Sequence, residues 1–145
     1  MKVFDISLQV IYYILYMVYK IFCNKGENMN ILVIDDSIFV RQFMKKYLIE
    51  LKPEIEINYA ATGEEGYQVY TEKKPSLIIT DLLMPGMGGQ AFIEAVRKTD
   101  NQTKIVVLSA DIQKSVKEEI MSIGISAFLN KPITRENLVT ISNLI

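Results

Sequence analysis

The chain has 145 residues, which is the size of one ordinary domain and too short for two of average size. Half of its residues are hydrophobic and 23% are charged, so the composition is that of a folded protein rather than of a disordered one. With 16 basic and 17 acidic residues the net charge is −1, which leaves no broad positive field to attract nucleic acid.

Two absences restrict the chemistry. Histidine does not occur, and Cys23 is the single cysteine. The sequence therefore excludes imidazole metal sites, catalytic triads that use histidine, a phosphohistidine on this chain, an internal disulfide and a cysteine-rich zinc site. The composition suits a reducing, cytoplasmic setting. Carboxylates, hydroxyls, lysines and the backbone remain as functional groups.

The first 28 residues differ in composition from the rest. Residues 6–23 are almost entirely apolar, and their 18 positions are at the lower limit for a helix that spans a bilayer. The segment lacks the small-residue cleavage site of a secretory signal. Met29 stands directly before the first predicted strand, as it would at a natural start of the protein. Three interpretations of residues 1–28 stay open: a start-site artefact, a membrane anchor and an extra surface helix.

From Met29 onward, short β-branched runs alternate with amphipathic helical stretches. The predicted strands are Asn30–Ile34, Ile55–Ala60, Ser76–Thr80, Lys104–Ser109 and Ile125–Leu129. The first, third and fourth of them are apolar without alternation, as is typical of parallel strands buried on both faces.

Helical stretches follow each of these strands. The first predicted helix runs from Ser37 to Leu51, with Phe39, Phe43, Tyr47 and Leu48 near helical spacing. The second begins at Thr62, which forms a capping box with Glu65, and the last begins after Pro132 with Thr134 as its cap. Between them, helices are predicted at Gly89 to Lys98 and at Gln113 to Ile123. Five strand–helix repeats predict an α/β fold: a doubly wound, five-stranded parallel sheet with helices on both faces.

Polar residues follow the carboxyl ends of four predicted strands. They are Asp35 and Asp36 after the first, Asp81 after the third, Ser109 at the end of the fourth, and Lys131 after the fifth. Because such sheets bind ligands beyond these ends, where the strand order reverses, we expect the side chains to share one crevice. Clustered acids are costly unless a cation neutralises them, and oxygen-only ligands favour magnesium over zinc.

Each of these residues also has an ordinary explanation when taken alone. Asp35 or Asp36 could cap a helix, Asp81 could belong to a turn before Met84-Pro85-Gly86, and Lys131 could be a solvated surface lysine. The convergence of four strand ends favours the joint functional interpretation, in which Lys131 and the Ser109 hydroxyl meet phosphoryl oxygens.

The ordered set of motifs resembles the response-regulator receiver domain, the family that includes the single-domain chemotaxis regulators. The matching features are Asp35-Asp36 after ILVI, Asp81 after LIIT with Met84-Pro85-Gly86-Met87-Gly88-Gly89, Ser109-Ala110 after IVVL, and Phe128 with Lys131-Pro132. The resemblance covers residues 29–145, for which it implies the flavodoxin-like receiver fold, and leaves out the hydrophobic extension over residues 1–28.

The resemblance implies that Asp81 accepts a phosphoryl group from a phosphohistidine on a partner histidine kinase. Magnesium would be held by Asp36, Asp81 and the backbone carbonyl of Leu83, with Asp35 acting mainly through water. Lys131 would pair with the transferred phosphoryl group. Such a protein promotes its own phosphorylation and dephosphorylation but does not turn over external substrates.

The resemblance also implies a switch. The Ser109 hydroxyl would shift toward the phosphoryl group and the Phe128 ring would turn into the vacated space, while the Lys131-Pro132 peptide would be cis. The face built from the fourth helix, the fifth strand and the fifth helix of the domain would then bind a downstream protein, and a phosphatase is a further partner. Gly88 departs from the family pattern, since aspartate is frequent there.

Two other classes compete with this interpretation. A magnesium-dependent phosphatase of the haloacid dehalogenase type also forms an aspartyl phosphate, but it needs an acid two residues after its nucleophile at the end of its first strand. That place holds Ser37 after Asp35, or Ile38 after Asp36. A degenerate domain that only binds partners or a flavin would have lost part of the acid–lysine set, and the first strand does not open into a glycine-rich phosphate loop.

Overall fold

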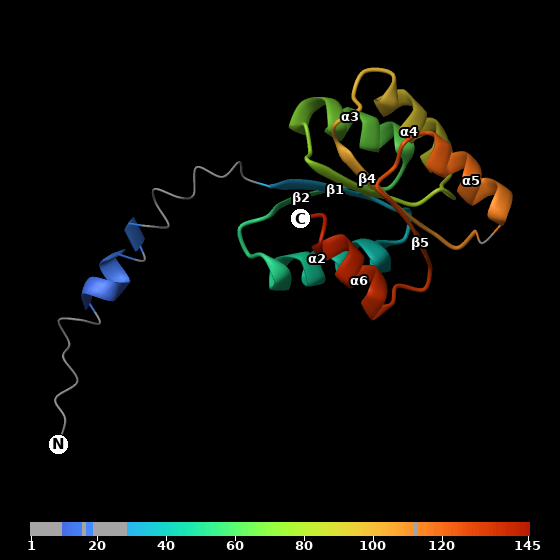
Figure 1. Cartoon of the computed structure of the whole chain (residues 1–145). Helices are drawn as coiled ribbons and strands as arrows, with labels where there is room; N and C mark the ends of the chain where they lie inside the picture. The colour runs from blue at the N-terminus through green and yellow to red at the C-terminus, as the bar shows by residue number, and fades with distance from the viewer. Residues whose placement is uncertain (1–9, 16, 19–28, 112) are drawn as a thin grey trace.

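The computed structural model describes residues 10–15, 17–18, 29–111 and 113–145 (Figure 1). Residues 10–15 and 17–18 are helical and their side chains are exposed. The rest of the 1–28 segment, including Cys23, lies outside the described residues. Within the described ranges, no helix combines the length and the apolar character needed to cross a membrane.

The body of the chain is built on one parallel sheet. Its strands are β1 (Asn30–Ile34), β2 (Glu56–Ala60), β3 (Leu77–Thr80), β4 (Lys104–Ser109) and β5 (Ala127–Asn130). They lie in the order β2-β1-β3-β4-β5, so the sheet is five-stranded and parallel throughout, as predicted. The strand order reverses between β1 and β3, where Ile34 is paired with Thr80, and the carboxyl ends of these two strands are therefore side by side.

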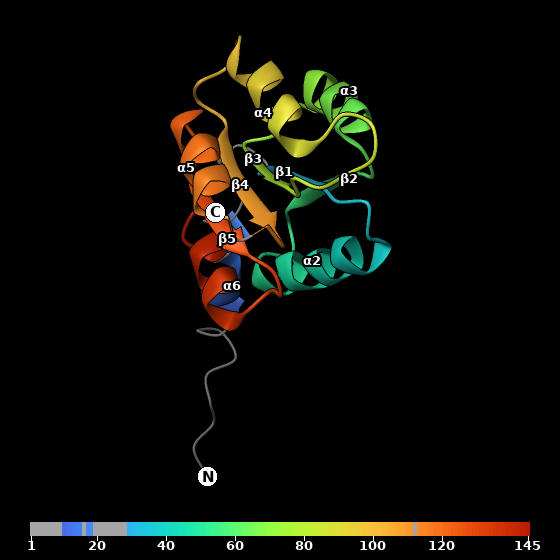
Figure 2. The ribbon, with the colours of Figure 1, turned by 90° about the vertical axis from the view of Figure 1, so that its right-hand side faces the viewer.

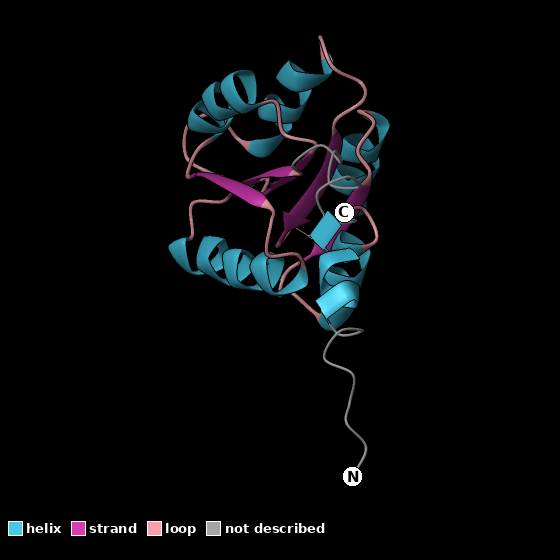
Figure 3. Cartoon of the chain, turned by 90° about the vertical axis from the view of Figure 1, so that its left-hand side faces the viewer, coloured by secondary structure: helices cyan, strands magenta, loops and turns pink. Residues whose placement is uncertain are grey.

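Helices cover both faces of the sheet. They are α2 (Ile38–Leu51), α3 (Gly63–Lys73), α4 (Gly89–Arg97), α5 (Lys114–Ser122) and α6 (Arg135–Ser142). Figures 1 and 2 show α3, α4 and α5 on one face and α2 and α6 on the other, and Figure 3 shows the same three layers from the opposite side. This confirms the predicted doubly wound fold.

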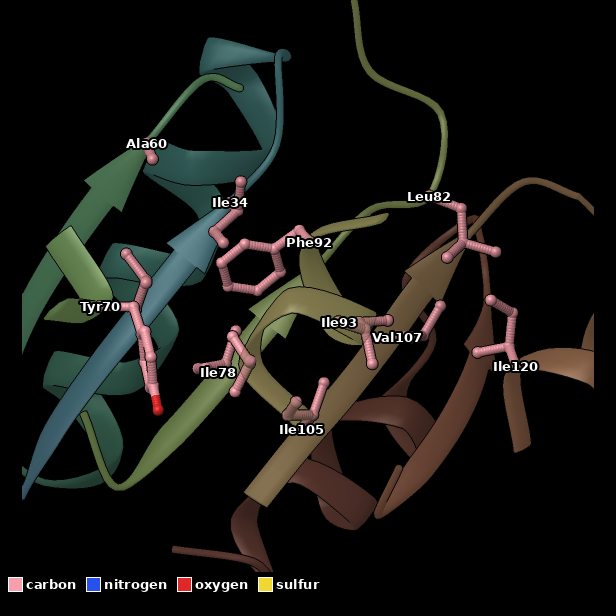
Figure 4. Packing of buried hydrophobic residues seen from close by; sticks show 12 residues of the cluster. Ile34, Ala60, Tyr70, Ile78, Leu82, Phe92, Ile93, Ile105, Val107 and Ile120 are labelled. Carbon is pink, nitrogen blue, oxygen red and sulfur yellow. The ribbon is translucent and has the colours of Figure 1, made fainter. Parts of the chain in front are cut away.

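Alternate residues of the central strands pack into two separate cores. Leu32, Ile34 and Ile78 face α3, α4 and α5, where Phe92 is fully buried (Figure 4). The intervening strand residues face α2 and α6; they include Ile31, Val33, Leu77 and Ile79, and they pack with Met44, Leu48 and Ile141. Burying one such side chain contributes about 1.5–3 kcal/mol, so the doubly buried β1 and β3 form a rigid support for the residues that follow them.

Side-chain caps fix the starts of three helices. The hydroxyls of Ser37, Thr62 and Thr134 accept a backbone N–H three residues later. The predicted pairing of Thr62 with Glu65 forms only in part, because the Glu65 carboxylate accepts the N–H of Ala61 instead of that of Thr62. These caps place the first turns of the helices close to the strand ends.

The inward face of α2 differs from the one that the sequence suggested. Met44 and Leu48 are buried, whereas Phe39 is 75% exposed and Phe43 is 37% exposed. Phe39 and Phe43 form an i, i+4 row of their own, adjacent to the row of Val40 and Met44. Both rows fit helical spacing, and only the second one points at the sheet.

Candidate functional site

Asp81 is buried at the end of the central strand β3, with 6% of its surface exposed. Its Oδ1 accepts the backbone N–H groups of Leu82 at 2.7 Å and Leu83 at 3.2 Å. Its Oδ2 accepts a hydrogen bond from Lys131 Nζ at 2.8 Å. One carboxylate oxygen is thus fixed by backbone N–H groups, and the other faces the Lys131 ammonium group.

Asp35 follows β1 and is even more buried, at 2%. Its Oδ1 accepts the N–H of Ser37 at 2.8 Å, and its Oδ2 accepts a hydrogen bond from Lys131 Nζ at 2.7 Å. Arg41, on the second turn of α2, donates to the Asp35 backbone carbonyl at 2.6 Å. Asp35 is therefore held in place through both its backbone and its side chain.

Asp36 completes a cluster of acids and is exposed to solvent. One carboxylate oxygen from each of Asp35, Asp36 and Asp81 lies within 4.8 Å of the others. With Lys131 the four groups carry a formal charge of −2, so the lysine leaves the cluster partly uncompensated. A set of oxygen donors with excess negative charge and one open side fits a hard divalent cation such as Mg²⁺.

Lys131 lies between the two buried acids. It follows the edge strand β5, its side chain is 19% exposed, and its backbone N–H donates to the Ser109 carbonyl at 2.8 Å. Burial alone would lower the pKa of Lys131, but the hydrogen bonds and negative charge of Asp35 and Asp81 outweigh it and raise that pKa. The ammonium is therefore charged at neutral pH. The Lys131-Pro132 peptide bond is cis, as the resemblance implied.

The other predicted site residues surround this cluster at different depths. Ser109 is fully buried, and its Oγ accepts the N–H of Asp111 at 3.2 Å. Phe128 packs on the core beneath α5, where Lys117 Nζ lies 5.8 Å from the centre of its ring. The Leu83 side chain is 60% exposed. The structure thus joins Asp35, Asp36, Asp81 and Lys131 directly, whereas Ser109 is linked to Lys131 through the backbone.

The loop between β3 and α4 depends on glycine. The Gly89 N–H donates to the Leu82 carbonyl at 3.0 Å and closes the loop. A Cβ atom on Gly89 would lie 1.9 Å from the backbone oxygen of Asp81, which is an impossible approach. Gly86 has a φ of +72°, a left-handed conformation that glycine adopts without strain. The loop can therefore pass this close to Asp81 only because Gly89 has no side chain.

Two features of the site were missed by sequence reasoning. One is Arg41, whose contact with Asp35 depends on the turn of α2. The other is an apolar groove next to Lys131, with a volume of about 260 Å³, lined by Phe39, Val40, Phe43, Lys131, Pro132 and Ile133. The signal in the sequence was the pair of phenylalanines four residues apart, directly after the acid pair.

Comparison with known proteins agrees with this geometry. The family model described as the response regulator receiver domain matches residues 31–143. The chemotaxis protein CheY of Thermotoga maritima is 31% identical over 113 residues, which cover 78% of this chain and 93% of that protein. The chemotaxis protein CheY of Bacillus subtilis is 28% identical over 113 residues, with coverage of 78% and 93%.

Solved structures give the same result. Chemotaxis protein CheY4 of Vibrio cholerae superposes with a TM-score of 0.72 at 30% identity, covering 82% of this chain and 100% of that one. The receiver domain of the Francisella response regulator 1452 superposes with a TM-score of 0.71 at 27% identity, covering 81% and 95%. The chain belongs to the response regulator receiver domain family.

Proposed function

We propose that this protein is a stand-alone response regulator of a two-component phosphorelay, with Asp81 as its phosphoacceptor. Receiver domains take phosphoryl groups from histidine kinases and act as signalling proteins rather than as substrate-turnover enzymes. The observation that carries the proposal is the position of the Asp81 carboxylate, which Leu82 and Leu83 hold by one oxygen and Lys131 contacts at the other. The chemotaxis relatives, of which this chain covers 93%, support the proposed place in chemotaxis.

The chemistry requires no general base. An ionised Asp81 is already a nucleophile, so one of its oxygens forms the new bond to phosphorus while the phosphorus–nitrogen bond of the donor phosphohistidine breaks. The electron pair of that bond leaves with the donor imidazole. Lys131 would neutralise part of the charge on the aspartyl phosphate, and the Ser109 hydroxyl would donate to a phosphoryl oxygen.

Magnesium is the cofactor that we assign to the acid cluster. Asp36 and Asp81 would hold it directly together with the Leu83 backbone carbonyl, and Asp35 would act through water. Bound there, the ion would neutralise the acids and the charge that develops on the transferred group. Asp36 suits a direct ligand because it is exposed to solvent and one of its carboxylate oxygens lies within 4.8 Å of those of Asp35 and Asp81.

Two surfaces are assigned to protein partners. The groove formed by Phe39, Phe43 and Pro132 adjoins Lys131, and we assign it to the kinase that delivers the phosphoryl group. The face of α5, β5 and α6 is assigned to the downstream protein, because it holds Phe128, the residue proposed to change position after phosphorylation. We propose that the receiver domain acts in the cytoplasm, the reducing setting that its composition suits.

The proposal is tested by covalent labelling. Incubated with acetyl phosphate and Mg²⁺, the full chain is expected to gain one phosphoryl group by mass spectrometry, and chelation of the metal with EDTA should prevent this. Labelling without a divalent cation would contradict the proposed site. Sustained hydrolysis of a generic phosphomonoester would instead support a phosphatase of the haloacid dehalogenase type, which the family assignment does not favour.

A second experiment tests the metal ligands. Asp36→Ala is expected to weaken Mg²⁺ binding by more than about tenfold, the lower end of the cost of losing a residue that only orients a ligand. The loss should clearly exceed that of Asp35→Ala, because Asp36 is assigned a direct bond to the ion and Asp35 is not. Isothermal titration calorimetry on the two variants and the unchanged protein measures the difference. Equal losses of affinity would show that the two acids contribute alike and would overturn the ligand assignment.

A further inference from the structure

The loop between β3 and α4 is attached to a helix that has no part in the acid cluster. The backbone of Met87 makes two hydrogen bonds to the first turn of α3. Its N–H donates to Glu64 Oε1 at 2.7 Å, and its carbonyl accepts the N–H of Gly63 at 3.1 Å. The fit is close, since a Cβ atom on Gly63 would lie 2.3 Å from the Met87 oxygen.

The loop supplies few side-chain contacts of its own. Gly88 is the N-cap of α4 and provides no side-chain hydrogen bond to the helix. Gly86 has the left-handed backbone noted above, and a Cβ atom there would lie 2.7 Å from Glu64 Oε1. Among the described side chains, the Glu64 carboxylate is the one that bonds to the backbone in the middle of this loop.

The position of this loop bears directly on the acid cluster. The loop begins at Leu82 and Leu83, whose N–H groups hold Asp81 Oδ1, and it is closed by the bond from Gly89 to Leu82. The Leu83 carbonyl, assigned above to the cation, belongs to the same segment. Because the loop is short and is closed by the Gly89 bond, we expect a displacement at Met87 to shift both of these groups.

We propose that Glu64 is a positioning residue for the phosphoacceptor site, which holds the β3–α4 loop so that the Leu83 carbonyl and Asp81 keep the geometry that a cation requires. The inference rests on the proposed function and adds a residue from outside the acid cluster to it. Hydrogen bonds from its own N–H and from that of Met87 lower the pKa of Glu64, the direction expected of a carboxylate that accepts backbone N–H groups.

The chain offers a matched control for this residue. Glu65 is its neighbour in the first turn of α3, is exposed as well, and also accepts a backbone N–H, that of Ala61 at 2.8 Å. Glu65→Ala therefore removes the same charge and one backbone hydrogen bond without touching the loop. Glu64→Gln keeps an oxygen acceptor for Met87, whereas Glu64→Asp keeps the charge on a side chain that is one methylene shorter.

The experiment compares these variants, each made in the full chain, with the unchanged protein. The first measurement is made without metal. In ¹⁵N spectra, Glu64→Ala and Glu64→Asp are expected to speed amide hydrogen exchange at Met87, Leu83 and Gly89, while Glu64→Gln stays near the unchanged protein. In Mg²⁺ titrations followed by the same amides, Glu64→Ala should bind about tenfold more weakly, the lower end of the effect of residues that orient metal ligands. Glu65→Ala should leave both measurements unchanged.

The outcomes separate this inference from the proposed function. If the unchanged protein binds Mg²⁺ and is phosphorylated, but Glu64→Ala and Glu65→Ala behave alike, Glu64 has only a helix-capping role and the inference is wrong. A Glu64→Gln variant as impaired as Glu64→Ala would also contradict it, because the acceptor oxygen would then be irrelevant. A loss confined to the Glu64→Ala and Glu64→Asp variants would support it.

Discussion

Asp81→Asn is expected to abolish both covalent phosphorylation and the response of Phe128 to phosphorylation mimics. The amide oxygen of asparagine can still accept the N–H groups of Leu82 and Leu83, so the loop is retained. The neutral amide is not a nucleophile, however, and it removes one of the two negative charges beside Lys131. In ¹⁵N spectra, beryllofluoride with Mg²⁺ should shift the amide signals around Phe128 in the unchanged protein and leave them unshifted in the variant.

The control for this substitution is Asp111→Asn. Asp111 lies near the end of β4, where its Oδ1 accepts the N–H of Gln113, and it is not part of the acid cluster. The Asp111 variant is expected to retain the beryllofluoride response. A response that persisted in Asp81→Asn would move the phosphoacceptor to Asp35 or Asp36. An unchanged spectrum in the natural sequence would disconnect Phe128 from the site.

Gly89→Ala is expected to destabilise the protein by about 3 kcal/mol and to impair phosphorylation, because the added methyl group has no space. Its Cβ would lie 1.9 Å from the Asp81 carbonyl oxygen and 2.8 Å from the Leu82 Cα, and both are backbone atoms of the site. The first turn of α4 would have to move away from β3, and Asp81 or the loop would move with it. Urea unfolding measures the loss of stability, and labelling with acetyl phosphate measures the loss of function.

The neighbouring glycine gives the matched control. Gly88 has φ −69° and ψ 167°, a conformation open to alanine, and its Cβ would lie 3.1 Å from the Leu82 carbonyl oxygen. Gly88→Ala should therefore cost less than about 1 kcal/mol and leave labelling intact. Equal destabilisation by the two substitutions would mean that the loop relaxes around either methyl group and that the short approach to Asp81 imposes no constraint.

The fold could be predicted because its strands have an unambiguous pattern. ILVI, LIIT and IVVLS leave no polar face, so they must be covered on both sides, and the alternation with helices then fixes a parallel sheet. Element ends were less certain. The second and fifth predicted strands begin one and two residues earlier than β2 and β5, at Ile55 and Ile125, where apolar side chains precede the paired residues.

The sequence predicted those residues of the site that stand at the ends of strands. Asp35, Asp36, Asp81 and Lys131 are each the first or second residue after a strand, and parallel strands bring such residues to one edge. Contacts made by helices were out of reach, because they depend on how each helix is rotated about its axis. Phe39 was therefore expected in the apolar face of its helix but lies at the surface.

The same limit applies to residues that act through the backbone. Nothing in the order of residues shows that Glu64 reaches the N–H of Met87, 23 positions further along the chain. The packing of Phe128 beneath Lys117 is likewise a matter of helix placement. Short-range patterns identify the groups that carry charge, and tertiary packing decides which other groups hold them.

The strand order has a mechanical consequence for signalling. Asp81 directly follows β3, an inner strand with a neighbour on each side. Phe128 lies in β5 and Lys131 directly follows it, and among the described residues β5 pairs with β4 alone. An edge strand can shift its position while disturbing the backbone hydrogen bonds to only one neighbouring strand. Phosphorylation of Asp81, as proposed, would therefore change the edge of the sheet while its centre stays fixed, so that the outer surface would change without a change of fold.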